Sequence, residues 1–229
     1  MISEALTSIN TQIADVCGRI GRNNQDIALI GVTKFAQDSD VEEAINLGLL
    51  HIGENRVQVA LEKFPHIPNL NKVTKHLIGH LQSNKVKLAI ENFDLIHSVD
   101  SIKLVDEIQK QAFNLGKVMD ILIQVNIANE EQKFGVDQSS VYVLLDHVRS
   151  LSHVHVKGLM TMAPFDAKET VVRTTFRDLK NIFNAATERY RGSNNIEMIH
   201  LSMGMSGDFK IAIEEGSNMV RVGSAIFKT

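Results

Sequence analysis

The feature that most constrains the fold is a regular alternation of short apolar segments with helix-like segments. After a first helical stretch, eight β-type runs occur at residues 27–32, 49–53, 75–81, 94–99, 119–127, 154–162, 197–204 and 218–224. Between them lie segments whose apolar residues recur at helical spacing. This alternation predicts parallel strands joined by crossover helices. Eight such units in 229 residues predict an α/β fold, a (β/α)8 TIM-type barrel with an extra N-terminal helix.

No linker or shift of composition divides the chain, so residues 1–229 are predicted to form a single domain. An apolar content of 44% is enough for a sizeable core. An open, doubly wound sheet is the structural alternative. It is disfavoured because it usually has fewer strands, and because the glycine-rich dinucleotide turn expected after its first strand is missing.

Composition excludes several classes of partner. The net charge of −3, with both signs scattered along the chain, gives no basic stripe for nucleic acid. No apolar stretch is long enough to cross a bilayer, and the amphipathic, acidic start does not resemble a signal peptide. Cys17 is the only cysteine and can form no intrachain disulfide, which favours a reducing compartment. We therefore expect a cytoplasmic protein without membrane or nucleic-acid partners.

Glycine and serine gather where the last two predicted strands end. TIM barrels place their chemistry at the carboxyl ends of the strands and often hold a phosphate with the loops after strands seven and eight. The segment LSMGMSGDF ends the seventh run, and RVGSAIF ends the eighth. Each could be an ordinary turn. Together they favour a phosphorylated ligand, held by the residues Ser202, Gly204, Ser206, Gly207, Gly223 and Ser224.

Two cations complete this pattern. Lys34 follows the first strand, where a lysine most simply extends its amine into water. Arg221 interrupts the apolar eighth strand, so its guanidinium either points outward to a carboxylate or needs an acceptor inside the barrel. A partly buried amine near a second cation is well suited to form an imine with an aldehyde. A lysine, an arginine and a phosphate cradle together suggest pyridoxal phosphate.

Two histidine pairs are the candidates for a metal site. They are His76 with His80 in HLIGH, and His153 with His155 in HVH. The second pair opens its strand and so lies at the end of the barrel opposite the predicted site. No acidic residue or cysteine stands beside either pair at ligand spacing. We therefore expect core or surface histidines and no bound metal.

The motifs GVTK, HIGENRVQ, HLIGHLQSNK, NIANEEQKFG, GLMTM, LSMGMSGD and RVGSAIF occur in an order that resembles the pyridoxal phosphate homeostasis family, single-domain relatives of alanine racemase. The resemblance implies a barrel that carries the cofactor as a Schiff base on Lys34. It implies phosphate contacts near Ser202, Met203, Gly223 and Ser224, and Arg221 at the pyridine nitrogen. It also implies three further pocket residues, which are Asn55, His76 and Met205.

The resemblance implies intracellular homeostasis of pyridoxal 5′-phosphate, by sequestration or by delivery to apo-enzymes, with little or no turnover. In alanine racemases a tyrosine from an additional domain of the dimer partner serves the second face of the cofactor, and this chain ends where that domain would begin. Arginine can only donate hydrogen bonds, so Arg221 would keep the ring nitrogen unprotonated. We expect a monomer that is not an enzyme. The alternatives are an amino-acid racemase and a metal-dependent barrel hydrolase.

Overall fold

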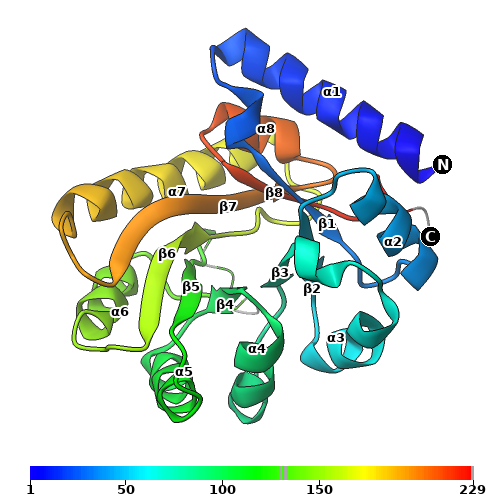
Figure 1. The fold of residues 1–229 in the computed structure, drawn as a ribbon. Helices are drawn as coiled ribbons and strands as arrows, with labels where there is room; N and C mark the ends of the chain where they lie inside the picture. The colour runs from blue at the N-terminus through cyan, green and yellow to red at the C-terminus, as the bar shows by residue number, and fades with distance from the viewer. Residues whose placement is uncertain (129, 131–133, 228–229) are drawn as a thin grey trace.

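Eight parallel strands close into a barrel in chain order within the residues that the computed structural model describes, which are 1–128, 130 and 134–227 (Figure 1). The pairing of the first strand with the last, with Ile30 opposite Arg221, closes the sheet. The predicted (β/α)8 barrel is therefore confirmed, and the open-sheet alternative is wrong. The strands are β1 (Ala28–Val32), β2 (His51–Glu54), β3 (Thr74–Leu77), β4 (Leu95–Val99), β5 (Met119–Gln124), β6 (Val154–Met160), β7 (Ile196–Met205) and β8 (Met219–Val222).

Helices surround the barrel and connect its strands. The α-helices are α1 (Ile2–Ile20), α2 (Asp38–Asn46), α3 (Val57–Lys63), α4 (Val86–Asn92), α5 (Ile102–Asn114), α6 (Ser140–Val148), α7 (Glu169–Arg189) and α8 (Phe209–Glu214). Short 3-10 helices lie in the connections, at η1 (Asn24–Asp26), η2 (Phe64–His66), η3 (Leu70–Lys72) and η4 (Ser83–Lys85). Among the described residues, none of these helices has the length and apolar content to cross a membrane.

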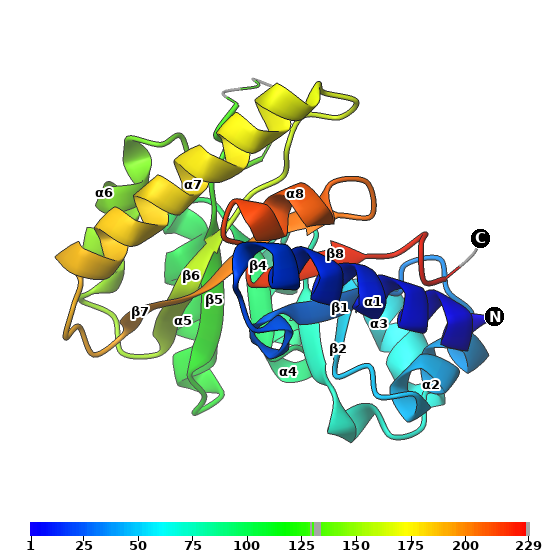
Figure 2. The same ribbon diagram turned by 90° about the horizontal axis from the view of Figure 1, so that it is seen from above.

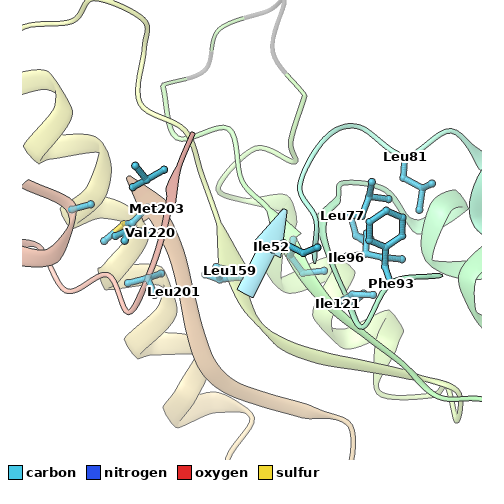
Figure 3. Packing of buried hydrophobic residues seen from close by; sticks show 14 of the residues in the cluster. Ile52, Leu77, Leu81, Phe93, Ile96, Ile121, Leu159, Leu201, Met203 and Val220 are labelled. Atoms are coloured by element: carbon cyan, nitrogen blue, oxygen red, sulfur yellow. The ribbon is translucent and has the colours of Figure 1, made fainter. Parts of the chain in front are cut away.

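The apolar core has two parts because each strand has two faces. The larger part packs the outer faces of the strands against the helices, and Figure 3 shows Leu77, Leu81 and Phe93 close together in it. The smaller part comprises Ile30, Leu95, Leu122, Met160 and Met219. These five residues come from different strands and fill the barrel interior. The interior also contains buried polar side chains, among them His76, His97, Ser202 and Arg221.

Helix α1 lies outside the barrel, beside α8 and α2 (Figures 1 and 2). Its buried residues recur every three or four positions and form one apolar stripe, made by Ile2, Leu6, Ile9, Ile13, Val16 and Cys17. Arg22 follows the helix and donates hydrogen bonds to the carbonyl oxygens of Ile213 and Ser217, at 2.9 and 2.8 Å. The predicted N-terminal helix thus packs against α8, and the residue Arg22 that follows it is hydrogen-bonded to the end of the same helix.

Candidate functional site

A cavity of about 450 Å³ lies at the carboxyl ends of β1, β7 and β8, where a barrel of this type carries its chemistry. It brings together seven residues that the sequence predicted, which are Lys34, Met205, Ser206, Gly207, Arg221, Gly223 and Ser224. The lining residues are Val32, Lys34, Phe35, Ala36, Phe165, Met205, Ser206, Gly207, Arg221, Gly223, Ser224 and Phe227. The cavity therefore combines an amine, a guanidinium and a loop of glycine and serine.

Lys34 extends from the end of β1 into this cavity, and its side chain is exposed. Its Nζ lies 4.6 Å from the centre of the Phe35 ring. The predicted partial burial of this amine is not found, because the Lys34 side chain is exposed although it lines the cavity. Phe35 and Phe165 also line the cavity and are 67% and 96% exposed, so two aromatic side chains border the cavity where it meets solvent.

A buried network under the Lys34 loop holds its backbone in place. The ammonium of Lys63 donates to the carbonyl oxygens of Thr33 and Ala36, at 2.6 and 2.9 Å, on either side of Lys34. The same ammonium lies 3.5 Å from Glu54 Oε1, which accepts a hydrogen bond of 2.6 Å from the Thr33 hydroxyl. Lys63 from α3 thus positions the β1–α2 loop, while Glu54 from β2 balances its charge.

We expect Lys63→Met to lower the free energy of unfolding by about 3–5 kcal/mol, because it leaves the buried Glu54 carboxylate without its cation. Urea denaturation monitored by circular dichroism measures the change. The double variant Lys63→Met/Glu54→Gln should recover part of the loss. Lys110→Met is the control: its side chain is 67% exposed and its ammonium lies 3.8 Å from Glu107, so a change within about 0.5 kcal/mol is expected. Equal losses in the two single variants would contradict the assigned role.

The loops after β7 and β8 face each other across the cavity. Ser206 Oγ lies 3.4 Å from both the backbone nitrogen of Gly223 and the hydroxyl of Ser224. Asp208 caps the end of β7, because its Oδ1 accepts from the backbone nitrogen of Met205 at 2.5 Å. Burial raises the pKa of the Asp208 carboxyl, while the nearby positive charge of Arg221 opposes this effect. Because these contacts between the two loops are long, the hydroxyl groups of Ser206 and Ser224 can rotate toward an anion. The Gly223 amide likewise has no short hydrogen bond that would compete with one.

Arg221 points into the barrel and is 4% exposed. Its Nη1 donates to Ser202 Oγ at 2.5 Å, and its Nη2 donates to the carbonyl oxygen of Thr161 at 2.9 Å. Burial lowers the pKa of the guanidinium to about 10, so it remains charged at neutral pH. Of the two orientations left open by the sequence, the structure adopts the inward one. The cation is fixed by neutral acceptors and reaches the wall of the cavity.

The other predicted site residues lie around the cavity without lining it. Ser202 is buried behind Arg221. Met203 packs its side chain in the outer core, where Figure 3 labels it beside Leu201 and Val220. His76 is buried inside the barrel between two other histidines. Asn55 follows β2, and its buried Oδ1 has no hydrogen-bond partner in the structure. Ligand contacts by these four side chains remain predictions.

Sequence reasoning assigned Ser206 to the predicted phosphate site, but it did not assign Thr161, His51 or His97. Ser206 was part of the serine pattern, but its position opposite Gly223 depends on how two loops meet. Thr161 contributes only a backbone carbonyl, which no sequence pattern marks. The signal that could have identified His51 and His97 is the alternation of side chains along the strands that contain HIG and IHS, because every second side chain of a strand points to the same face.

Histidines do not form a metal site in the part of the chain that the structure describes, where no group of three or more His, Cys, Asp or Glu side chains is arranged to hold an ion. His80 stacks on Phe134, with ring centres 3.9 Å apart. His155 lies 3.6 Å from Asp120 at the opposite end of the barrel. Lys133, in the NIANEEQKFG segment, lies outside the described residues.

The fold and the cavity define a class of protein, a barrel of the kind found in alanine racemases. Residues 25–229 match the family model "Alanine racemase, N-terminal domain". The chain is also similar to the alanine racemase of Clostridium difficile 630, with a TM-score of 0.76 and 15% identity, over 96% of this chain and 55% of the racemase. That likeness shows a shared fold. More specifically, the chain belongs to the pyridoxal phosphate homeostasis protein family.

Full-length relatives establish this membership. The pyridoxal phosphate homeostasis protein of Aquifex aeolicus is 40% identical over 98% of this chain and 96% of its own length. The protein of that name from Escherichia coli K12 is 32% identical over 99% of this chain and 95% of its own length. PipY of Synechococcus elongatus PCC7942, solved with PLP bound, is 32% identical, with a TM-score of 0.86 over 99% of this chain and 100% of that chain. The resemblance inferred from the motifs is confirmed.

Proposed function

We propose that this protein binds pyridoxal 5′-phosphate and serves in its intracellular homeostasis, with Lys34 as the residue that bonds the cofactor. The observation that carries the proposal is the cavity in which Lys34, Arg221 and the Gly223–Ser224 loop meet. The full-length family relatives and the PLP-bound PipY structure support the same ligand. When bound, the cofactor supplies an aldehyde that condenses with amines, together with a ring that can withdraw electrons.

The residues present fit this cofactor. Asn55 carries a buried amide oxygen without a partner, so it can accept a hydrogen bond from a ligand. A Cβ added at Gly223 would lie 3.2 Å from the Cβ of Val32, so only glycine leaves the backbone amide open without crowding. Lys34 supplies the amine, while Ser206, Gly223 and Ser224 would hold the phosphate. Arg221 would face the ring nitrogen.

The geometry of Arg221 favours holding the cofactor over catalysis. A guanidinium only donates hydrogen bonds, and it remains charged at neutral pH. Beside it, a ring nitrogen is stabilised as an unprotonated acceptor. A protonated ring nitrogen is the better electron sink, so this arrangement weakens the capacity of the site to stabilise a carbanion. The site therefore suits retention and release of the cofactor.

Both tyrosines of the chain lie away from the cavity. Tyr142 is in α6, and Tyr190 follows α7. The Tyr190 hydroxyl donates to Asp146 Oδ1 at 2.9 Å, and burial, with the adjacent carboxylate, raises its pKa to about 12. Neither side chain is placed to exchange a proton with a ligand at Lys34. Racemisation in which a tyrosine exchanges the proton would require a tyrosine in the cavity beside Lys34, and the described residues place none there.

We expect the purified protein, loaded with pyridoxal phosphate, not to racemise L-alanine at the rate of a dedicated enzyme. The lack of a positioned acid or base costs on the order of 10²–10⁴ in rate. Incubation in deuterated water, followed by NMR of the α-proton and by chiral chromatography, measures the exchange. Lys34→Ala is the control for uncatalysed exchange. Turnover of several per second that depends on Lys34 would favour a racemase instead.

We propose further that the protein acts as a cytoplasmic monomer and passes the cofactor to apo-enzymes. Cys17 is a free, buried cysteine, and burial raises the pKa of its thiol, which suits a reducing compartment. The open cavity mouth between Phe35 and Phe165 supports release of a ligand to another protein. Light scattering after size-exclusion chromatography tests the monomer. Recovery of activity by an apo-enzyme mixed with the loaded protein tests the transfer.

A further inference from the structure

Three histidines form an unbroken hydrogen-bonded chain through the barrel interior. His51 Nδ1 lies 3.0 Å from His76 Nε2, and His76 Nδ1 lies 2.9 Å from His97 Nε2. His97 Nδ1 lies 3.0 Å from Ser202 Oγ, which also contacts Arg221 Nη1 at 2.5 Å. The chain crosses β2, β3, β4, β7 and β8 and ends at the guanidinium that lines the upper cavity.

Arg221 and Ser202 favour one direction for the hydrogen bonds in this series of histidines. The guanidinium can only donate, so Ser202 Oγ accepts from it. The Ser202 hydroxyl also has a hydrogen to donate, and its other side-chain partner among the described residues is His97 Nδ1, so this hydrogen is satisfied when Ser202 donates to His97. A neutral His97 must then carry its hydrogen on Nε2 and donate to His76 Nδ1. By the same reasoning His76 donates from Nε2 to His51 Nδ1. The tautomers follow from this pairing of donors and acceptors.

His51 is the open end of the chain. It lines a second cavity of about 370 Å³ at the amino-terminal end of the barrel, together with His200 and Asp26. His51 is half-buried, whereas His76 and His97 are 1% and 0% exposed. The lower cavity and the upper, ligand-binding cavity are therefore joined by a continuous line of polar groups.

His51, His76 and His97 are neutral at neutral pH. Burial, with neighbouring histidines in support, lowers the pKa of His76 to about 3 and that of His97 well below its usual range. Burial also lowers the pKa of His51 and of His200.

Charged groups approach the chain from several elements. In the lower cavity, His51 faces Asp26 of η1 and His200 of β7. Lys157 of β6 and Glu197 of β7 act on His200. Arg221 of β8 carries the positive charge at the upper end, and Asp208 acts on that guanidinium.

We propose that His51, His76 and His97 are positioning residues of one directional chain, through which the group at position 51 decides which way the Ser202 hydroxyl points beneath Arg221. An acceptor at position 51 maintains the direction described above. A group there that only donates, such as a protonated His51, reverses it: each remaining ring then carries its hydrogen on Nδ1, and His97 donates to Ser202. Ser202 Oγ then accepts from both His97 and Arg221, so its own hydrogen must point away from His97. This change disturbs the hydrogen bond by which Ser202 holds the Arg221 guanidinium.

Imidazole nitrogen NMR of 15N-histidine protein without cofactor tests the direction. At pH 7.5 we expect His76 and His97 to carry hydrogen on Nε2. His51→Gln offers an amide oxygen as acceptor, so it should keep both tautomers. His51→Lys offers only donors and should move both hydrogens to Nδ1. His200→Lys places the same charge in the same cavity outside the chain and should leave both tautomers unchanged.

Cofactor retention, which rests on the proposed function, is the second readout. Equilibrium dialysis should show about tenfold weaker binding of pyridoxal phosphate by His51→Lys, as expected for the loss of one hydrogen bond to a charged group, and changes within about twofold for the other two variants.

If His51→Lys does not fold, acid titration of the wild type replaces it: the tautomers of His76 and His97 should then switch together as His51 takes up its proton. Tautomers that do not respond to position 51, or Nδ1–H rings at pH 7.5, would overturn the chain. Responsive tautomers without cofactor binding would instead refute the proposed function.

Discussion

Replacement of Lys34 by alanine is expected to abolish the covalent attachment of pyridoxal phosphate completely. The wild type should be yellow after loading, and borohydride should fix the cofactor to Lys34, because the amine lies in the cavity beside Arg221 and the Gly223–Ser224 loop. Absorbance spectra before and after reduction, followed by peptide mass spectrometry, measure the attachment. Noncovalent binding through the phosphate loops should persist in the variant.

Two matched variants separate loss of the nucleophile from loss of charge. Lys34→Arg retains a cation but offers no amine that forms an imine, so it should behave as the alanine variant does. Lys85→Ala removes a lysine from η4, outside the cavity lining, and should leave the attachment intact. A reduced adduct on Lys85 in the wild type would show that the bonding lysine has been assigned wrongly.

Substitution of Gly223 by aspartate is expected to weaken cofactor retention about 100-fold or more. The new carboxylate would face the phosphate at short range, and repulsion between such charges near a protein surface amounts to several kcal/mol. The added side chain would also press on Val32, since a Cβ at this position lies 3.2 Å from the Val32 Cβ. Equilibrium dialysis with pyridoxal phosphate gives the dissociation constants.

Gly223→Ala adds the Cβ without the charge, so it should fall between the wild type and the aspartate variant. Ser202→Ala should have a smaller effect than Gly223→Asp, because Ser202 supports Arg221 from behind the cavity. Urea denaturation without cofactor checks that the variants fold. Equal retention by wild type and Gly223→Asp would place the phosphate elsewhere and leave the loop after β8 with a structural role.

The fold could be predicted because the information is local and repeated. Each strand is a short apolar run, each helix has an apolar stripe, and the right-handed crossover leaves few ways to assemble eight such units. In the structure α8 begins at Phe209, at the end of the LSMGMSGDF segment that marks the end of the seventh run. The extent of the single domain, 1–229, stays a prediction.

The site was only partly predictable because some contacts depend on three-dimensional arrangement. The position of Arg221 in an apolar strand indicated an unusual cation, but its partners, Ser202 and the Thr161 carbonyl, come from other strands. Lys63 resembles any lysine at the end of an amphipathic helix. Its contacts beneath Lys34 arise only when α3 packs under the β1–α2 loop. The exposure of the Lys34 side chain likewise depends on that loop.

The contact between α1 and α8 has a consequence for synthesis on the ribosome. Arg22 and its partner Ile213 are 191 residues apart, so α1 forms early but its docking surface is made almost last. At about 5–20 residues per second, the stripe of Ile2, Leu6, Ile9 and Ile13 waits roughly 10–40 s for that surface. During this interval the nascent chain exposes an amphipathic helix that the finished protein conceals. The stripe of α1 is therefore a natural binding site for a chaperone until the barrel closes.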